Sequence, residues 1–106
     1  MIAKTPVPPY YAVIFSSVRT DGDHGYSEMS AKMVELAALQ DGFLGMESAR
    51  DGLGITVSYW RDLASIKNWK ENSQHILARN KGRSDWYKSF KTRIAFIERD
   101  YEFDRE

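Results

Sequence analysis

The chain has 106 residues, the size of a single domain, and its 42% hydrophobic and 28% charged residues are ordinary for a globular protein. Its 15 basic side chains balance 15 acidic ones, so no net field would draw it to nucleic acid or to an anionic membrane. The absence of cysteine excludes disulfides, thiolate nucleophiles and cysteine-ligated metal centres, and it favours a cytoplasmic protein.

The first nine residues contain Pro6, Pro8 and Pro9, which predict an extended arm rather than a signal peptide. The longest strongly apolar stretch, Tyr10–Phe15, is far too short to cross a bilayer. We therefore expect one domain over residues 1–106, with an extended arm at 1–9 and no membrane partner.

The first half of the chain predicts a strand, a helix and a second strand. Aromatic and β-branched residues dominate Tyr10–Val18, which predicts a strand, and Thr20–Gly25 predicts a loop because it is rich in Asp and Gly. Apolar residues then recur at helical spacing over Tyr26–Gln40. An Asp-Gly pair ends this helix, and Phe43–Arg50 predicts the second strand.

The second half predicts two more strands around a second helix. A hairpin turn leads into a strand at Gly54–Trp60, and a helix follows over Leu63–Asn80. We expect a short helical segment at Ser84–Phe90 and a closing strand at Arg93–Glu102. The order β-α-β-β-α-β is that of a ferredoxin-like α+β fold, in which an antiparallel four-stranded sheet carries both helices on one face.

Both faces of the predicted sheet carry apolar side chains. In the third strand, Ile55, Val57 and Tyr59 point to one face and Trp60 points to the other. Two helices can cover only one face, and an uncovered apolar face usually marks an interaction site. We therefore expect a homodimer whose two sheets pack face to face; the alternative is a monomer with a mixed face.

The second helix carries three candidate catalytic residues. Its apolar stripe includes Trp69, whose indole would either pack in the core or form a flat wall for an aromatic substrate. Asn72 would either lie in solvent or donate a hydrogen bond to a developing oxyanion. His75 is a candidate base or iron ligand, but it lies off the stripe, and a helix break near Asn72 would be needed to turn it inward.

Three further residues are candidates for contact with a substrate. Trp60 ends the third strand and has the same two interpretations as Trp69. Arg79 and Trp86 belong to a stretch in which basic and aromatic side chains alternate. This stretch is either an anion site with rings for stacking or a solvated surface with its rings packed inward. Its members are Arg79, Lys81, Arg83, Trp86, Tyr87, Lys88, Phe90, Lys91 and Arg93.

No motif for a metal or a phosphate emerges from the sequence. His24 lies beside Asp21 and Asp23 in the first loop, but the spacing fits no known ligand set and predicts a polar loop. No Gly-rich stretch stands between a strand and a helix, so a dinucleotide site is not expected.

The layout resembles the antibiotic biosynthesis monooxygenase family over about Tyr10–Phe103. The most specific segments are Gly42–Ser48, Tyr59–Leu63 with the following Trp69, and Arg99–Phe103. The resemblance implies ferredoxin-like protomers that pair through their sheets into a dimeric α+β barrel.

Two activities follow from this resemblance. One branch of the family oxidises polyphenols to quinones with O2 and without metal or flavin. In this branch Trp69 would stack the substrate, Asn72 would hold its oxyanion and His75 would act as base.

The other branch binds and degrades haem with an Asn in the first strand, a helix Trp and a helix His. Here Trp69 matches, His75 stands about one turn closer to it, and Ser16 or Ser17 occupies the place of the Asn. We therefore expect no cofactor, with haem as the alternative.

Two non-enzymatic alternatives share the same order of elements. An RNA-recognition module would need base-stacking aromatics in its third strand, where this chain has Leu53 and Ile55. A non-catalytic dimeric barrel would bind a small hydrophobic molecule without turnover.

Overall fold

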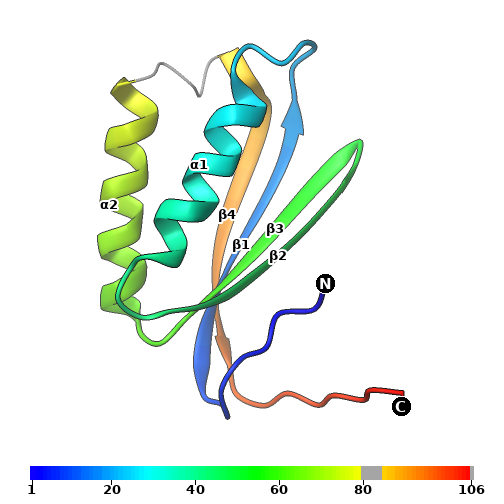
Figure 1. The fold of residues 1–106 in the computed structure, drawn as a ribbon, viewed down its shortest axis with the longest axis vertical. Coiled ribbons are helices and arrows are strands. Elements are labelled where there is room, and N and C mark those ends of the chain that lie inside the picture. The colour runs from blue at the N-terminus through cyan, green and yellow to red at the C-terminus, as the bar shows by residue number, and fades with distance from the viewer. Residues whose placement is uncertain (80–84, 106) are drawn as a thin grey trace.

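The computed structural model describes the backbone of residues 1–79 and 85–105, and the side chains of residues 1–74 and 85–105. The elements follow the predicted ferredoxin-like α+β order (Figure 1): β1 Tyr10–Arg19, α1 Tyr26–Ala38, β2 Phe43–Asp51, β3 Leu53–Trp60, α2 Leu63–Arg79 and β4 Tyr87–Ile97. Within this part of the chain the strands form one antiparallel sheet in the order β2-β3-β1-β4. Both helices lie on the same side of it (Figure 1). None of the described helices combines the length and the apolar character needed to cross a membrane.

The prediction for the last strand was wrong at both ends. A helical segment was expected at Ser84–Phe90, but only Asp85 and Trp86 are helical among the described residues there, and β4 begins at Tyr87. The strand also ends at Ile97, whereas it was expected to run over Arg93–Glu102. The reason is the neighbouring β1, whose free edge pairs with β4 along its whole length and so satisfies the backbone hydrogen bonds of both strands.

Trp60 shows which face of the sheet the helices cover. Its ring stacks on that of Trp69 in α2, with 6.3 Å between centroids and 23° between planes. Trp60 pairs in register with Tyr11 of β1, which in turn pairs with Phe96 of β4. Because directly paired residues point to the same side, these rings all belong to the helix-facing side of the sheet.

The opposite side carries the second apolar set that the sequence predicted. Ile55, Val57 and Tyr59 alternate with Trp60 along β3 and therefore point away from the helices. Leu53 is 52% exposed and Ile55 is 40% exposed on this open face. A shallow groove beside them is lined by residues of β1, β3 and β4 that include Ser16, Leu53 and Lys91. The sheet-to-sheet homodimer itself stays a prediction.

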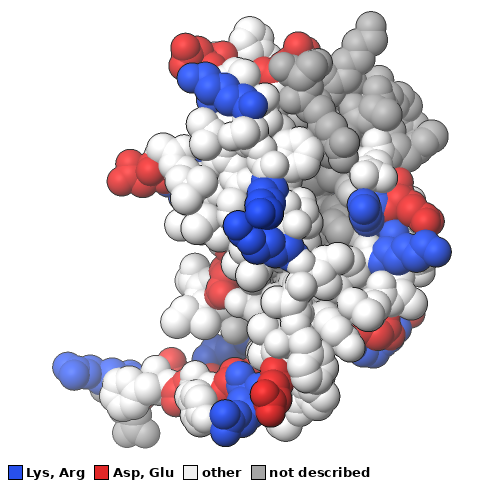
Figure 2. All heavy atoms as spheres, turned by 180° about the vertical axis from the view of Figure 1, so that it is seen from behind, with Lys and Arg blue, Asp and Glu red and all other residues white. Residues whose placement is uncertain are grey.

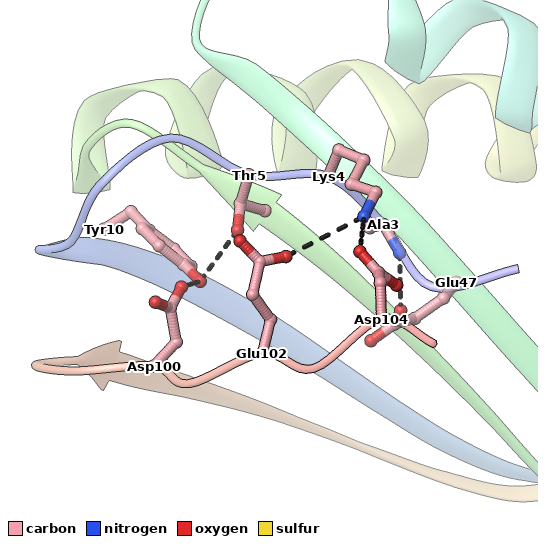
Figure 3. Close-up of polar contacts among 8 residues, drawn as sticks. All are labelled: Ala3, Lys4, Thr5, Tyr10, Glu47, Asp100, Glu102 and Asp104. Atoms are coloured by element: carbon pink, nitrogen blue, oxygen red, sulfur yellow. Dashed lines mark hydrogen bonds and ion pairs between the residues drawn. The ribbon is translucent and has the colours of Figure 1, made fainter. Parts of the chain in front are cut away.

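The two terminal segments lie side by side over one end of the open face (Figure 3). The Tyr10 hydroxyl donates to Asp100 at 2.5 Å and accepts a hydrogen bond from Thr5 at 2.9 Å. Glu47 accepts hydrogen bonds from the Ala3 amide at 2.9 Å and from the Tyr59 hydroxyl at 2.5 Å. The terminal segments project from the body, which is hollowed next to them on the side away from the helices (Figure 2).

Candidate functional site

Helix α2 begins at a capped turn that fixes Trp69 over the sheet. Asp62 accepts a hydrogen bond from the Ser65 amide at 2.8 Å. Hydrogen bonds from the Ser65 hydroxyl and amide lower the pKa of Asp62 to about 2, because they stabilise the ionised carboxylate. Ile66 in the first turn is buried, which directs the same face of the helix, with Trp69 one turn further on, toward the sheet.

The two stacked tryptophans are not equally accessible. Trp60 is 0% exposed, its Nε1–H donates to Ser58 Oγ at 2.8 Å, and Phe43 packs edge-on against it. Trp69 is half-buried and keeps part of its surface free. A ligand would reach Trp60 only if this packing opened, so Trp60 supports Trp69 from behind. A direct role of Trp60 in substrate binding stays a prediction.

The structure does not bring Asn72 to the tryptophan pair. The Asn72 side chain is exposed, and its amide donates to Gln40 Oε1 at 3.4 Å. Helix α2 runs without a break from Leu63 to Arg79, so the break that was considered near Asn72 is absent. His75 and Arg79 belong to this helix, but their side chains lie outside the described residues. The predicted roles of these residues in catalysis and binding stay predictions.

Trp86 directly precedes β4 and is buried. It is 5% exposed, its Nε1–H donates to the His24 carbonyl at 2.9 Å, and Tyr26 packs edge-on against it. Of the basic stretch predicted around it, Lys88, Lys91 and Arg93 are exposed along β4. Lys81 and Arg83 lie outside the described residues.

The polar loop before α1 has a structural role. Asp23 accepts hydrogen bonds from the Gly25 and Ser27 amides and from the Ser27 hydroxyl. These bonds lower the pKa of Asp23 and satisfy backbone donors at the start of the helix. His24 Nε2 lies 3.1 Å from the Asp21 carbonyl. The loop therefore organises the start of α1.

Sequence reasoning missed a row of four residues that crosses the whole sheet on its helix-facing side. Arg50 pairs with Gly54, Gly54 with Ser17, and Ser17 with Phe90. The Arg50 guanidinium lies across the Gly54 backbone and donates to Ser17 Oγ at 2.6 Å and to the Ser17 carbonyl at 3.2 Å. The sequence feature that could have predicted this row is Gly54, because a glycine inside a strand often marks the close approach of another group.

An aromatic cluster adjoins this row. The Phe15 ring lies 5.5 Å from that of Tyr87 and 5.4 Å from that of Phe90, measured between centroids. Burial, followed by the proximity of Tyr26, raises the pKa of Tyr87, so its hydroxyl stays protonated at neutral pH. The Arg19 guanidinium lies 3.5 Å from the Tyr26 ring centroid, a cation–π contact that ties β1 to α1.

The helices leave part of the helix-facing side of β4 exposed. Phe90, Ile94 and Phe96 point to this side but are 41%, 54% and 56% exposed. Trp69 lies toward one end of this surface, and the Arg50 row lies toward the other. Gly54 lies six positions before Trp60 in β3, which corresponds to about 20 Å along the strand. The surface is thus long, aromatic and cationic at one end.

Comparison with known proteins places the chain in a family. The model of the antibiotic biosynthesis monooxygenase family matches residues 9–81. YqjZ, an uncharacterised protein of Bacillus subtilis (strain 168), is 54% identical over 100 residues, which span 92% of this chain and 88% of that protein.

Solved structures share the fold at low sequence identity. SnoaB of Streptomyces nogalater, described as a cofactor-independent oxygenase, aligns with a TM-score of 0.66 at 9% identity and covers 92% of this chain and 100% of its own. PA3566 of Pseudomonas aeruginosa has a TM-score of 0.66 at 19% identity and covers 91% of this chain and 99% of its own. The sequence match and the fold agree: the chain belongs to the antibiotic biosynthesis monooxygenase family.

Proposed function

We propose that the protein is a cofactor-independent monooxygenase that oxidises a small aromatic compound with O2 between the sheet and the helices. Family membership supports the reaction class, and SnoaB, which shares the fold, is a cofactor-independent oxygenase. The observation that carries the proposal is the partly exposed row Phe90, Ile94 and Phe96 on the helix-facing side of β4. Such a surface suits a flat apolar substrate.

The reaction needs no external reductant when the substrate is a phenol with a free ring position. A base removes the hydroxyl proton, the ring anion passes an electron to O2, and a carbon–oxygen bond forms. The oxygen–oxygen bond then breaks; one oxygen atom stays on the quinone, and the other leaves as water with the hydroxyl proton and the ring hydrogen. The protein's contribution is to orient the ring and to stabilise its anion.

Within this proposal, Trp69 orients the substrate and His75 is the base. Trp69 is half-buried over the sheet and is backed by the fully buried Trp60. Asn72 contacts Gln40, which follows α1, at the surface, and its role in holding the substrate oxyanion stays a prediction.

Oxygen uptake tests the proposal directly. The protein is supplied with 1-naphthol or phenol, which become quinones only by insertion of an oxygen atom, in air without flavin or reductant, and O2 consumption and quinone absorbance are recorded. We expect equimolar O2 use and quinone formation with at least one phenol. Trp69→Ala should lower kcat/KM by about 100-fold through loss of orientation, whereas Trp69→Phe, which keeps a ring, should lose less. Uptake at the buffer rate with every phenol, or unchanged rates in Trp69→Ala, would contradict the proposal.

A haemin titration separates the alternative activity. A haem-degrading enzyme would shift the Soret band in air, lose the shift in His75→Ala, and bleach the band once reductant is added. The first strand offers Ser16 or Ser17 where that branch has an amide, and Ser17 is buried and hydrogen-bonded to Arg50. We expect no Soret shift with either protein.

We also propose that two copies pair through the open face of the sheet. Leu53 and Ile55 are exposed there, and the groove beside them is lined by residues of β1, β3 and β4. A second copy of the same face would bury these apolar side chains. Each Å² of apolar surface that is removed from water stabilises the pair by about 25 cal/mol.

A further inference from the structure

We infer that the row Arg50–Gly54–Ser17–Phe90 is an anion site that holds an aromatic carboxylate or phenolate, with the anion on Arg50 and the ring on Phe90. The inference goes beyond the proposed function, because this row lies about 20 Å along the strand from the Trp60–Trp69 pair. The binding it describes does not rest on that function.

The guanidinium of Arg50 is held in place without a counter-charge. It is fixed by Ser17 Oγ at 2.6 Å and by the Ser17 carbonyl at 3.2 Å. No carboxylate of the described residues forms an ion pair with it. A guanidinium has five N–H donors arranged for planar, bidentate contact, and two bonds to Ser17 leave others free.

Gly54 is what allows this placement. A Cβ at this position would overlap the Arg50 guanidinium, so any other residue would lift the arginine away from the sheet. Ser17, which anchors the guanidinium, is 2% exposed, so the anchor is rigid and shielded from water. A cation held in this way loses little freedom when it binds an anion.

The second arginine of this region contrasts with the first. Arg19 donates to the carbonyls of Trp86, Gly22 and Asp23 and lies over the Tyr26 ring. Its contacts are used to join β1 to the loop and to α1. Among the described residues Arg50 has hydrogen bonds to Ser17 alone, which marks it as a cation available to a ligand.

The surface next to Arg50 selects an aromatic ligand. Phe90 pairs with Ser17 in register, so its ring stands one strand away from the Ser17 anchor on the same side of the sheet, while the guanidinium lies over Gly54 in β3. Phe15 and Tyr87 back that ring. A ligand with a ring on Phe90 would place a carboxylate or an ionised hydroxyl toward Arg50.

The test uses 1-naphthoate and its uncharged analogue 1-naphthamide, titrated in argon-saturated buffer by isothermal calorimetry so that no turnover occurs. We expect naphthoate to bind about tenfold or more tightly than naphthamide, as a hydrogen-bonded charge contact requires. Arg50→Gln should remove this preference and leave naphthamide binding unchanged. Arg50→Lys should keep part of it, because the charge remains without the fork.

Two further variants separate the position of the charge from its presence. Gly54→Ala keeps Arg50 but displaces its guanidinium, so the preference should fall. Arg93→Gln removes one positive charge from the open face, where Arg93 pairs with Ile14, and should leave the preference intact. Circular dichroism confirms that each variant is folded, and if Gly54→Ala does not fold, Arg50→Gln and Arg93→Gln decide the matter.

Equal binding of the two probes to the wild type, no binding of either, or a preference that survives in Arg50→Gln would overturn the inference. An equal loss in Arg93→Gln would do the same, because the preference would then come from overall charge. A preserved naphthoate preference without oxygen uptake would instead overturn only the proposed function.

Discussion

Gly42 holds the turn between α1 and β2 in a backbone conformation that other residues rarely adopt. Its φ is 87°, and its carbonyl accepts a hydrogen bond from the Arg61 amide at 2.8 Å. A Cβ here would also overlap the side chain of Ser65, in the first turn of α2. Space and backbone conformation at this one position therefore join the end of α1 to the start of α2.

We predict that Gly42→Ala lowers the free energy of unfolding by about 2–4 kcal/mol, from the positive φ together with the overlap with Ser65. Gly52→Ala is the matched control: its φ is 77°, but nothing lies within 4 Å of the added carbon. It should cost only about 1 kcal/mol of strain. Urea unfolding followed by tryptophan fluorescence measures both, and equal losses would show that Ser65 moves aside freely.

The cap of α2 gives a pH dependence that can be assigned to Asp62. Its pKa falls from an ordinary value of 3.8 to about 2 in the folded protein. A depressed pKa means that the ionised carboxylate stabilises the folded state above pH 4, and that this contribution is lost as pH falls toward 2. Asp62→Asn keeps a capping oxygen without the charge. The wild type should therefore unfold at a higher urea concentration than Asp62→Asn at pH 6, and this difference should disappear near pH 2. A constant difference over this range would contradict the assignment.

At the scale of the elements, side-chain hydrogen bonds fix the two terminal segments to the open face. Tyr10 contacts Thr5 of one segment and Asp100 of the other, so a single hydroxyl joins both to β1. Glu47 anchors the first segment from β2, and hydrogen bonds from the Tyr59 hydroxyl and the Ala3 amide lower its pKa. Lys4 adds exposed ion pairs with Glu102 and Asp104, which contribute little by themselves.

We predict that Tyr10→Phe releases the second terminal segment while the sheet stays folded. Loss of the hydroxyl should cost about 1 kcal/mol of stability and speed amide hydrogen exchange over residues 98–105. Tyr101→Phe is the control, because Tyr101 is 86% exposed; it should leave exchange unchanged. If Tyr10→Phe exchanges at the wild-type rate in that range, the segment is held by contacts other than this hydroxyl.

For the whole molecule, the open face is where we predict that two copies pair. If two sheets pair there, Ile55→Glu places a charge in the interface and should convert a dimer of about twice the 12.2 kDa chain mass into a monomer, because burying an unpaired charge is costly. Leu39→Glu adds the same charge at an exposed position at the end of α1 and should leave the dimer intact. Light scattering after gel filtration measures the mass, and a monomeric wild type at micromolar concentration would contradict sheet pairing.

Local pattern was sufficient for the elements whose own residues show clear alternation, helical periodicity or a turn signal. The alternation in β1 and β3, the turns after α1 and β2, and the periodicity of α2 predicted those elements to within a few residues. Residues 87–90 were misjudged because their aromatic and basic residues also fit a helix. Pairing with β1, which lies about 70 residues away in the sequence, decides that they form a strand, and local propensity does not include that contact.

The sequence by itself determined the ferredoxin-like order, the presence of two apolar sheet faces and the tryptophan of α2 that faces the sheet, because side-chain periodicity fixes each of these. Only the tertiary structure decided that Trp60 is enclosed while Trp69 remains partly accessible, that Asn72 turns toward Gln40, and that Arg50 crosses Gly54 to Ser17. These facts depend on the strand order β2-β3-β1-β4, which brings residues from separate strands into one row. Register across a sheet arises from long-range hydrogen bonding, and no single segment of the chain contains it.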